Sequence, residues 1–295
     1  MTATVASPST RQRAREAGVD IDALATELGR DMISPGDIDD RLEGRRVGPG
    51  GDYRRYWDVD HARYGPVREE ATSRFGQIAA LNLAAAQQVI PAVTHHDRAD
   101  MTAIDAARAA FQDEARTRGA KLTALAFHVK ALARTLRDFP RFNASLSADG
   151  RTLFLKDYVH IGIAVDTPHG LMVPVIRDAD RKGLWRIAGE VADLATRAQQ
   201  RKVRADEMDG ASMSISNLGG IGGIGFTPIV NPPEVAILGI SRTEVASVWN
   251  GGAFVPTPMT PLDLSYDHRV VNGAYAARFL VRYINLLADP RRLMI

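Results

Sequence analysis

The residues best suited to chemistry are a histidine and its neighbours near the carboxyl end of the chain. His268 stands in the sequence SYDHRVVNG, between a strand-like PLDLS and a helical pattern that begins at Gly273. Asn272 lies at the expected start of that helix, about one turn after the histidine. Imidazole has an ordinary pKa of about 6.5, so a histidine at such a junction can act as a general base near neutral pH. The local pattern equally fits a histidine that only forms structural hydrogen bonds.

A glycine cluster, GGIGGIG, covers residues 219–225 and contains the spacing G-x-G-x-x-G. In dinucleotide-binding proteins this spacing opens a helix whose amino end faces the pyrophosphate. Here the next residues are FTPIVNPPEV, and prolines of this density disfavour a helix. The pattern therefore favours a tightly folded loop, where glycine lets the backbone approach a ligand or a partner chain, over a nucleotide site.

His95, His96 and Asp97 are residue types that bind metal ions. Neighbouring residues on a strand point to opposite faces, so the two imidazoles cannot share one ion without distortion. No third ligand is obvious in the sequence. We therefore expect a structural or exposed pair of histidines and no metal site.

From about residue 65, long helical patterns alternate with strand patterns and must position these residues. Apolar residues three and four apart predict helices over residues 71–90, 103–118, 121–138, 184–201 and 273–288. Strand patterns cover residues 92–96, 152–155, 159–165, 171–175, 212–216, 234–240 and 261–266. Because helices and strands do not alternate strictly, the pattern predicts an α/β layered sandwich with a mixed or largely antiparallel sheet.

The first 42 residues predict a separate small helical unit. Ser7 or Ser9 can cap a first helix that ends at Gly18, and a second helix can start at Pro35. Residues 43–64 are rich in glycine at their start and show no sustained period, which is typical of a linker.

The composition excludes several classes of protein. The 295 residues include no cysteine, which excludes a disulfide scaffold, a thiolate nucleophile, an iron–sulfur cluster and a cysteine-bound zinc. Lysine and arginine total 37 against 35 aspartates and glutamates, so no strong field for nucleic acid follows. No apolar run approaches the roughly 18–20 residues of a membrane span, and no secretory signal is visible. We expect a cytoplasmic protein that binds neither nucleic acid nor membrane.

Three segments match the pattern of a known family, in the right order. The sequence DHRVVNG at residues 267–273 matches the signature D-H-R-x-x-[D/N]-G. SISNLG at residues 214–219 leads into FTPIVNPPEVAILG at 226–239, and IGIAVDTP at 161–168 precedes GLMVPV. These segments resemble the catalytic domain of the dihydrolipoamide acyltransferases, core components of 2-oxoacid dehydrogenase complexes. The resemblance implies a chloramphenicol-acetyltransferase-like two-layer α/β sandwich with a mixed sheet over residues 65–295.

The resemblance also implies a reaction. Family members transfer an acyl group between dihydrolipoamide and coenzyme A. The amino-acid sequences of these segments are most similar to those of the bacterial pyruvate-type acetyltransferases. His268 takes the position of the family's general base, and Ser216 that of the hydroxyl that stabilises the oxyanion. Asn272 stands where many relatives have an aspartate that orients the histidine. In the family these residues meet between subunits, which implies a homotrimer and a cubic core of trimers.

Residues 6–42 resemble the family's peripheral subunit-binding domain, which binds the pyruvate decarboxylase component or dihydrolipoamide dehydrogenase. Residues 26–32 keep the length of the loop between that domain's helices and lack most of its glycines. The implied organisation is a subunit-binding domain over residues 1–42, a linker over 43–64 and the catalytic domain over 65–295. No lipoyl domain is recognisable, so we expect the lipoyl group to come in trans or from a missing domain.

Two alternatives remain beside this reading. The missing lipoyl domain and the altered loop fit a scaffold that assembles such a complex while its own acyl transfer is dispensable, although the presence of His268 and Ser216 argues against it. The fold shared with chloramphenicol acetyltransferase also allows an acyltransferase that acts on another small thiol, alcohol or carrier protein.

Overall fold

The computed structural model describes residues 4, 6–28, 33, 35–42, 59–168 and 170–294, and the chain forms two compact units, Met1–Ala71 and Thr72–Ile295. Most of the linker predicted over residues 43–64 lies outside the described residues, as do residues 29–32 of the altered loop. Among the described helices, none is long and apolar enough to cross a membrane.

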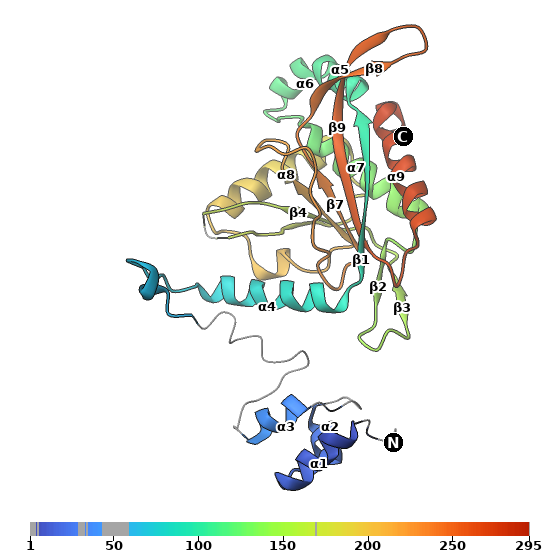
Figure 1. Cartoon of the computed structure of the whole chain (residues 1–295). Helices are drawn as coiled ribbons and strands as arrows, with labels where there is room; N and C mark the ends of the chain where they lie inside the picture. The colour runs from blue at the N-terminus through green and yellow to red at the C-terminus, as the bar shows by residue number, and fades with distance from the viewer. Residues whose placement is uncertain are drawn as a thin grey trace. The chain divides into compact units, whose positions relative to one another are not determined.

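The described part of the first unit consists mainly of short helices, α1 (Pro8–Glu16), α2 (Ile21–Leu28) and α3 (Pro35–Leu42), followed by the 3₁₀ turn η2 (His61–Tyr64) (Figure 1). Ser7 caps α1 because its hydroxyl accepts a hydrogen bond from the backbone N–H of Thr10. A small apolar core joins the helices and contains Ala14, Leu24, Ala25, Ile33 and Ile38. The sequence pattern did not predict α2, since this helix lacks the starting proline that marks the equally short α3.

The second unit is built on a seven-stranded mixed sheet in its described residues, with the order β1-β9-β7-β6-β4-β5 and with β8 paired to β9. Its strands are β1 (Ala92–Asp100), β4 (Ile161–Ala164), β5 (Val175–Ile176), β6 (Met213–Asn217), β7 (Ala236–Ile240), β8 (Glu244–Trp249) and β9 (Phe254–Asp267). Strands β4, β6 and β7 run parallel, and the other pairs are antiparallel. The predicted α/β class with a mixed sheet is confirmed. A separate ladder joins β2 (Ala144–Leu146) and β3 (Leu153–Leu155).

The largest difference from the predicted strands concerns the segment predicted over residues 261–266. It is only the end of β9, which has 14 residues and contains Pro256, Pro258 and Pro261. Prolines are rare inside strands, so the sequence pattern did not predict the first part of β9 as a strand. Its partner β8 was missed with it. The strand predicted over residues 171–175 is also mostly absent, because Met172 forms only an isolated bridge with Val165.

The helices of the second unit are α4 (Arg74–Val89), α5 (Thr102–Ala110), α6 (Gln112–Thr117), α7 (Ala124–Asp138), α8 (Leu184–Gln199) and α9 (Gly273–Ala288), with 3₁₀ turns η3 (Ala205–Glu207) and η4 (Pro290–Leu293). The single helix predicted over residues 103–118 is wrong. Phe111 separates α5 from α6, and its ring packs edge-on against Trp185 at 6.0 Å between centroids.

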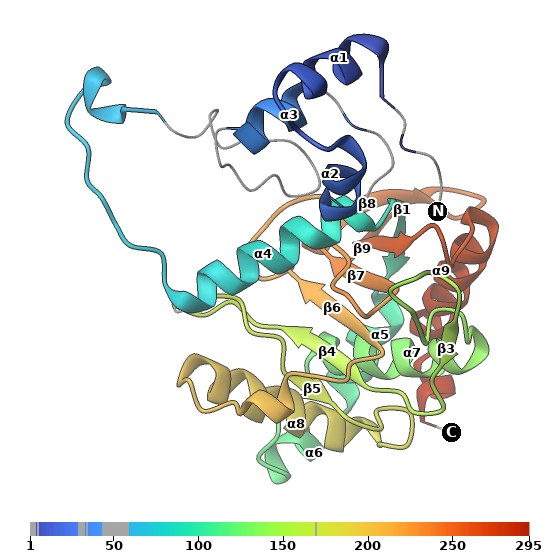
Figure 2. The same ribbon diagram turned by 90° about the horizontal axis from the view of Figure 1, so that it is seen from below.

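The sheet separates two layers. Its apolar face joins α7, α8 and α9 in the main core, where Leu262, Leu264 and Tyr266 of β9 are buried. Helix α4 lies on the other side of the strands (Figure 2), and Ile90, the residue that follows it, packs against Val230 and Ile237. Helices α7, α8 and α9 therefore cover the apolar face of the sheet, and loops and α4 lie on the opposite face.

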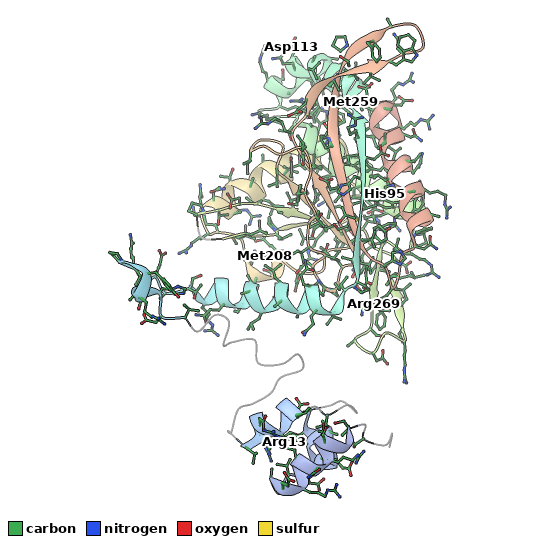
Figure 3. The ribbon with its side chains drawn as sticks, in the orientation of Figure 1. Arg13, His95, Asp113, Met208, Met259 and Arg269 are labelled. Atoms are coloured by element: carbon green, nitrogen blue, oxygen red, sulfur yellow. The ribbon has the colours of Figure 1, made fainter. Side chains whose placement is uncertain are left out.

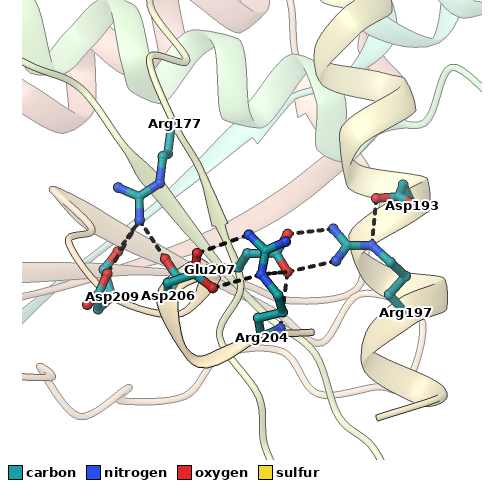
Figure 4. A network of polar contacts seen from close by, with 7 residues as sticks. All are labelled: Arg177, Asp193, Arg197, Arg204, Asp206, Glu207 and Asp209. Carbon is teal, nitrogen blue, oxygen red and sulfur yellow. Dashed lines mark hydrogen bonds and ion pairs between the residues drawn. The ribbon is translucent and has the colours of Figure 1, made fainter. Parts of the chain in front are cut away.

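An ion-pair network ties α8 to the turn that leads into β6 (Figure 4). Arg197 donates two hydrogen bonds of 2.9 Å to the carboxylate of Glu207 and one of 2.8 Å to Asp193. These hydrogen bonds raise the pKa of Arg197 and lower the pKa of Glu207. Arg204 pairs with Asp206 in the same turn. The network fixes the path of the chain just before Ser214 and Ser216.

Candidate active site

The second face of the sheet is polar, and it carries one of the predicted site residues. Residues directly paired across strands project to the same face, and residues two apart on one strand share that face. By this rule one face bears Thr94, His96, Ser214, Ser216, Asp263 and Ser265, from strands β1, β6 and β9. We call these six residues the polar face.

His268 lies in the turn that follows β9. Its backbone N–H donates to the carbonyl of Pro91 at 3.1 Å, and its exposed ring lies beside Tyr266 at 5.9 Å between centroids. The neighbouring residues hold the turn: the buried carboxylate of Asp267 accepts hydrogen bonds from the backbone N–H and the guanidinium of Arg269. This contact raises the pKa of Arg269. The signature residues Asp267 and Arg269 thus form an ion pair with each other, and the exposed imidazole of His268 remains accessible to a ligand.

Asn272 caps the final helix. Its side-chain oxygen accepts a hydrogen bond of 2.9 Å from the backbone N–H of Tyr275, and α9 begins at Gly273, as predicted. The cap, four residues after His268, fixes the start of the helix at Gly273. The amide oxygen is therefore occupied by the backbone of α9.

Ser216 lies far from His268 within one chain. Ser216 pairs with Gly239, and Gly239 pairs with Asp263, so the three residues form one row across the sheet. Asp267 stands four residues further along β9, which is roughly 13 Å along the strand and about 10 Å across two strand spacings. In Figure 3, Arg269 lies near one end of β1 and His95 lies partway along that strand. One chain does not bring Ser216 and His268 together.

A buried carboxyl group that the sequence analysis did not single out lies beneath the polar face. Glu234 precedes β7 and accepts a hydrogen bond of 2.9 Å from the Ser214 hydroxyl. Its other carboxylate oxygen has no hydrogen-bond partner among the described residues. Burial raises the pKa of Glu234 to about 7, although Ser214 and Lys156 act in the opposite direction. Only spatial proximity reveals this group, because Ser214 lies twenty residues away in the sequence.

Gly162 belongs to the same contact. A Cβ atom at this position would lie 2.3 Å from the Ser214 hydroxyl oxygen, which real side chains do not tolerate. The glycine of IGIAVDTP is therefore needed for β4 to lie beside β6. Two of the three family segments meet here, since Gly162 belongs to IGIAVDTP, and Ser214 and Glu234 belong to SISNLG and its continuation.

The structure also shows the surroundings of the glycine cluster at residues 219–225 and of the histidine pair His95 and His96. Residues 219–234, all described, contain no helix, which agrees with the loop predicted in place of a nucleotide site. His96 does not stand alone, since its Nδ1 lies 2.6 Å from Asp263 Oδ1. Within the described ranges, no group of three or more histidine, aspartate or glutamate side chains is arranged to hold a metal ion.

The fold and site define an acyltransferase domain. The family model for the 2-oxoacid dehydrogenases acyltransferase (catalytic domain) matches residues 65–295, and the chain belongs to this family. The resemblance seen in the sequence is confirmed.

Two curated relatives are similar to nearly the whole of this chain. The chain is 46% identical over 299 residues to the dihydrolipoyllysine-residue acetyltransferase component of the pyruvate dehydrogenase complex of Pseudomonas aeruginosa, and 45% identical over 300 residues to that of Azotobacter vinelandii. The alignments cover 98% of this chain but only 55% and 47% of the two relatives. The chain thus spans about half the length of the relatives it matches.

Two solved structures are similar to most of this chain. One is the dihydrolipoamide acetyltransferase of Azotobacter vinelandii, studied for the role of a serine, a histidine and an asparagine in its catalytic mechanism. The other is the cubic core of the pyruvate dehydrogenase multienzyme complex. Each has a TM-score of 0.79 and 51% identity, and the match covers 80% of this chain and 98% of the other.

Proposed function

We propose that this chain transfers an acetyl group between dihydrolipoamide and coenzyme A as a core component of a pyruvate dehydrogenase-type complex. The observation that carries the proposal is the turn at His268, where the Asp267–Arg269 pair holds an exposed imidazole in a chain of this acyltransferase family. The relatives named above, which are acetyltransferases of pyruvate dehydrogenase complexes, support acetyl over other acyl groups.

In the proposed mechanism, His268 is the general base. A thiol has an ordinary pKa of about 8.5 and imidazole about 6.5, so the neutral ring can take the coenzyme A proton as the sulfur attacks the thioester carbonyl of acetyl-dihydrolipoamide. The new carbon–sulfur bond forms while the carbonyl electron pair moves to oxygen, and the Ser216 hydroxyl donates to that oxyanion. Collapse breaks the bond to the dihydrolipoamide sulfur, which receives the proton from His268. Asn272 acts indirectly, by fixing the start of α9.

The proposed site needs two chains. Ser216 and His268 lie at different ends of the sheet in one chain, so a complete site forms where His268 of one subunit faces Ser216 of the next. Exposed apolar side chains on α4, including Leu81 and Val89, and on the β8–β9 hairpin, including Trp249 and Phe254, favour contacts between copies. We propose trimers that assemble further into a cubic core.

We further propose that residues 1–42 form a peripheral subunit-binding domain, with a linker over residues 43–64 before the catalytic domain at 65–295. The separate small core of α1, α2 and α3 supports this division. The partners would be the pyruvate decarboxylase component and dihydrolipoamide dehydrogenase. The lipoyl group would arrive in trans or from a domain outside this sequence. The cytoplasmic location remains a prediction.

The first test is acetyl transfer from acetyl-CoA to free dihydrolipoamide, measured together with the mass of the protein in solution. The unmodified protein should turn over as a large assembly. His268→Ala should lower the rate by roughly 10²–10⁴ and keep the assembly, because it removes only the base. His95→Ala serves as the matched control, since His95 points to the apolar side of β1.

Three other results of this assay would each contradict one part of the proposal. Turnover retained in His268→Ala would remove His268 from the mechanism. A large assembly of unmodified protein without turnover would favour the scaffold alternative. Transfer to another small thiol or alcohol, with none to dihydrolipoamide, would favour the alternative acceptor.

A further inference from the structure

One row of residues crosses the whole polar face at the level of Ser216. Strand pairing places Ser216 opposite Gly239, Gly239 opposite Asp263, and Asp263 opposite His96. All four therefore project toward the same side. Gly239 has no side chain, which leaves a gap in the row between the serine hydroxyl and the aspartate.

Asp263 is a buried carboxylate in the middle of this row, with 2% of its side chain exposed. Its Oδ1 lies 2.6 Å from Nδ1 of His96, whose side chain is 61% exposed. Its Oδ2 accepts a hydrogen bond of 3.1 Å from the backbone N–H of Phe226. A buried carboxyl group needs hydrogen-bond partners, and these two contacts supply one to each of its oxygens.

Phe226 follows the glycine cluster, and its ring fills the gap above Gly239. A Cβ atom at Gly239 would lie 2.8 Å from Cζ and 3.0 Å from Cε1 of this ring. Gly239 is the direct neighbour of Ser216 on the adjacent strand, so the ring lies over the position one strand spacing, roughly 5 Å, from the serine backbone. The glycine-rich loop over residues 219–225 is thus held next to Ser216 at its far end.

The loop has anchors at three places. Asn217 accepts a hydrogen bond of 2.9 Å from the backbone N–H of Gly219 at the start of the loop. Arg242 donates to the carbonyl of Ile221 at 2.9 Å in its middle. Asp263 holds its end through Phe226. Among these anchors, only Asp263 stands in the row of Ser216.

We propose that Asp263, held in place by His96, is a positioning residue that fixes the glycine-rich loop and the Phe226 ring beside Ser216, and so shapes the side of the site where the oxyanion forms. The inference rests on the proposed function, because it acts through Ser216. It requires no contact between Asp263 and the substrates. Small displacements beside a reacting group are costly in rate, so the effect should appear mainly in kcat.

The test compares kcat and KM for acetyl transfer in variants of the full chain. Asp263→Ala leaves the Phe226 N–H without its acceptor, and we expect kcat to fall at least about tenfold with KM changed much less. Asp263→Asn keeps an acceptor oxygen and should recover most of that loss. Thr94→Val is the matched control, because Thr94 forms the neighbouring cross-strand hydrogen bond, 2.7 Å to Ser265, on the same strands and face.

A second comparison uses the Ser216→Ala background. If Asp263 acts through Ser216, then Asp263→Ala should cost less than about twofold in that background, since coupled residues are not additive. A merely structural role predicts the same loss in both backgrounds. If Asp263→Ala does not assemble, Phe226→Ala tests the same loop with Asp263 intact and the same two backgrounds.

Failure of this inference is distinct from failure of the proposed function. An inactive unmodified protein contradicts the proposed function. The positioning role alone is overturned by either of two results, provided that the unmodified protein is active and Ser216→Ala lowers its rate. In the first, Asp263→Ala and Thr94→Val lower kcat by the same factor. In the second, Asp263→Ala lowers kcat by the same factor with and without Ser216→Ala. An unaffected Ser216→Ala variant overturns both the positioning role and the oxyanion role, and leaves acetyl transfer intact.

Discussion

At the scale of single residues, burial changes the ionisation of Glu234. Its pKa is raised to about 7 because desolvation disfavours the carboxylate. The folded state therefore holds this proton more tightly than the unfolded chain. The stabilising effect of the protonated group is complete below the ordinary value near 4.5 and is lost as the pH rises through 7.

Glu234→Gln should accordingly stabilise the protein in alkaline solution. A shift of this size corresponds to about 3 kcal/mol, so at pH 8 the variant should gain up to that free energy of unfolding, and at pH 5 much less. Urea unfolding at the two pH values measures it. Glu244→Gln, at an exposed position of β8, is the control. An equal effect of Glu234→Gln at both pH values would contradict the prediction.

At the scale of elements, α7 and α9 meet through a buried polar pair. His128 Nδ1 lies 2.5 Å from the Tyr283 hydroxyl, and both side chains are buried. Burial lowers the pKa of His128 to about 4 and raises that of Tyr283. The histidine stays neutral in the folded protein while the unfolded chain takes up a proton near pH 6.5.

Folding stability should fall with pH across this window. The loss begins as the pH drops below 6.5 and is complete near 4, with a total of about 3 kcal/mol from this group. The double variant His128→Leu with Tyr283→Phe removes both polar partners, so it should lose this part of the pH dependence. Unfolding at pH 7 and pH 4.5 measures the difference, with His61→Leu in the exposed turn η2 as control. Curves that fall in parallel would disprove the assignment.

At the scale of the whole molecule, the separation of Ser216 and His268 supports the proposal that the active unit is an assembly. This separation follows from the register of β6, β7 and β9, and it holds for any chain with this pairing. A site shared between neighbours can be rebuilt from two defective chains, because each supplies the residue that the other lacks.

Ser216→Ala and His268→Ala chains should each be nearly inactive alone and active together. When they are co-assembled in equal amounts, about one interface in four joins an intact His268 to an intact Ser216, so about a quarter of the activity should return. Mass measurement of tagged chains establishes the mixing. Mixed assemblies without recovered activity would place both residues in one chain's site and contradict the shared site.

Local signals predicted much of the fold. The helix that begins at Gly273 was predicted with its bounds because Asn272 caps it and its apolar stripe is regular, both of which depend on residues within a few turns. The position of His268 at the end of a strand followed in the same way. The first part of β9 was missed because prolines interrupt its pattern, and its partner β8, which contains no proline, was missed with it.

By itself, the sequence determined the family, the mixed α/β class, the loop nature of residues 219–225 and the candidate residues His268, Asn272 and Ser216, because motifs, caps and periodicity are local in the chain. Only the tertiary structure decided the burial of Glu234, the contacts of Asp263 with His96 and Phe226, and the distance between Ser216 and His268. These depend on strand register, which brings together or keeps apart residues that the sequence separates by tens of positions.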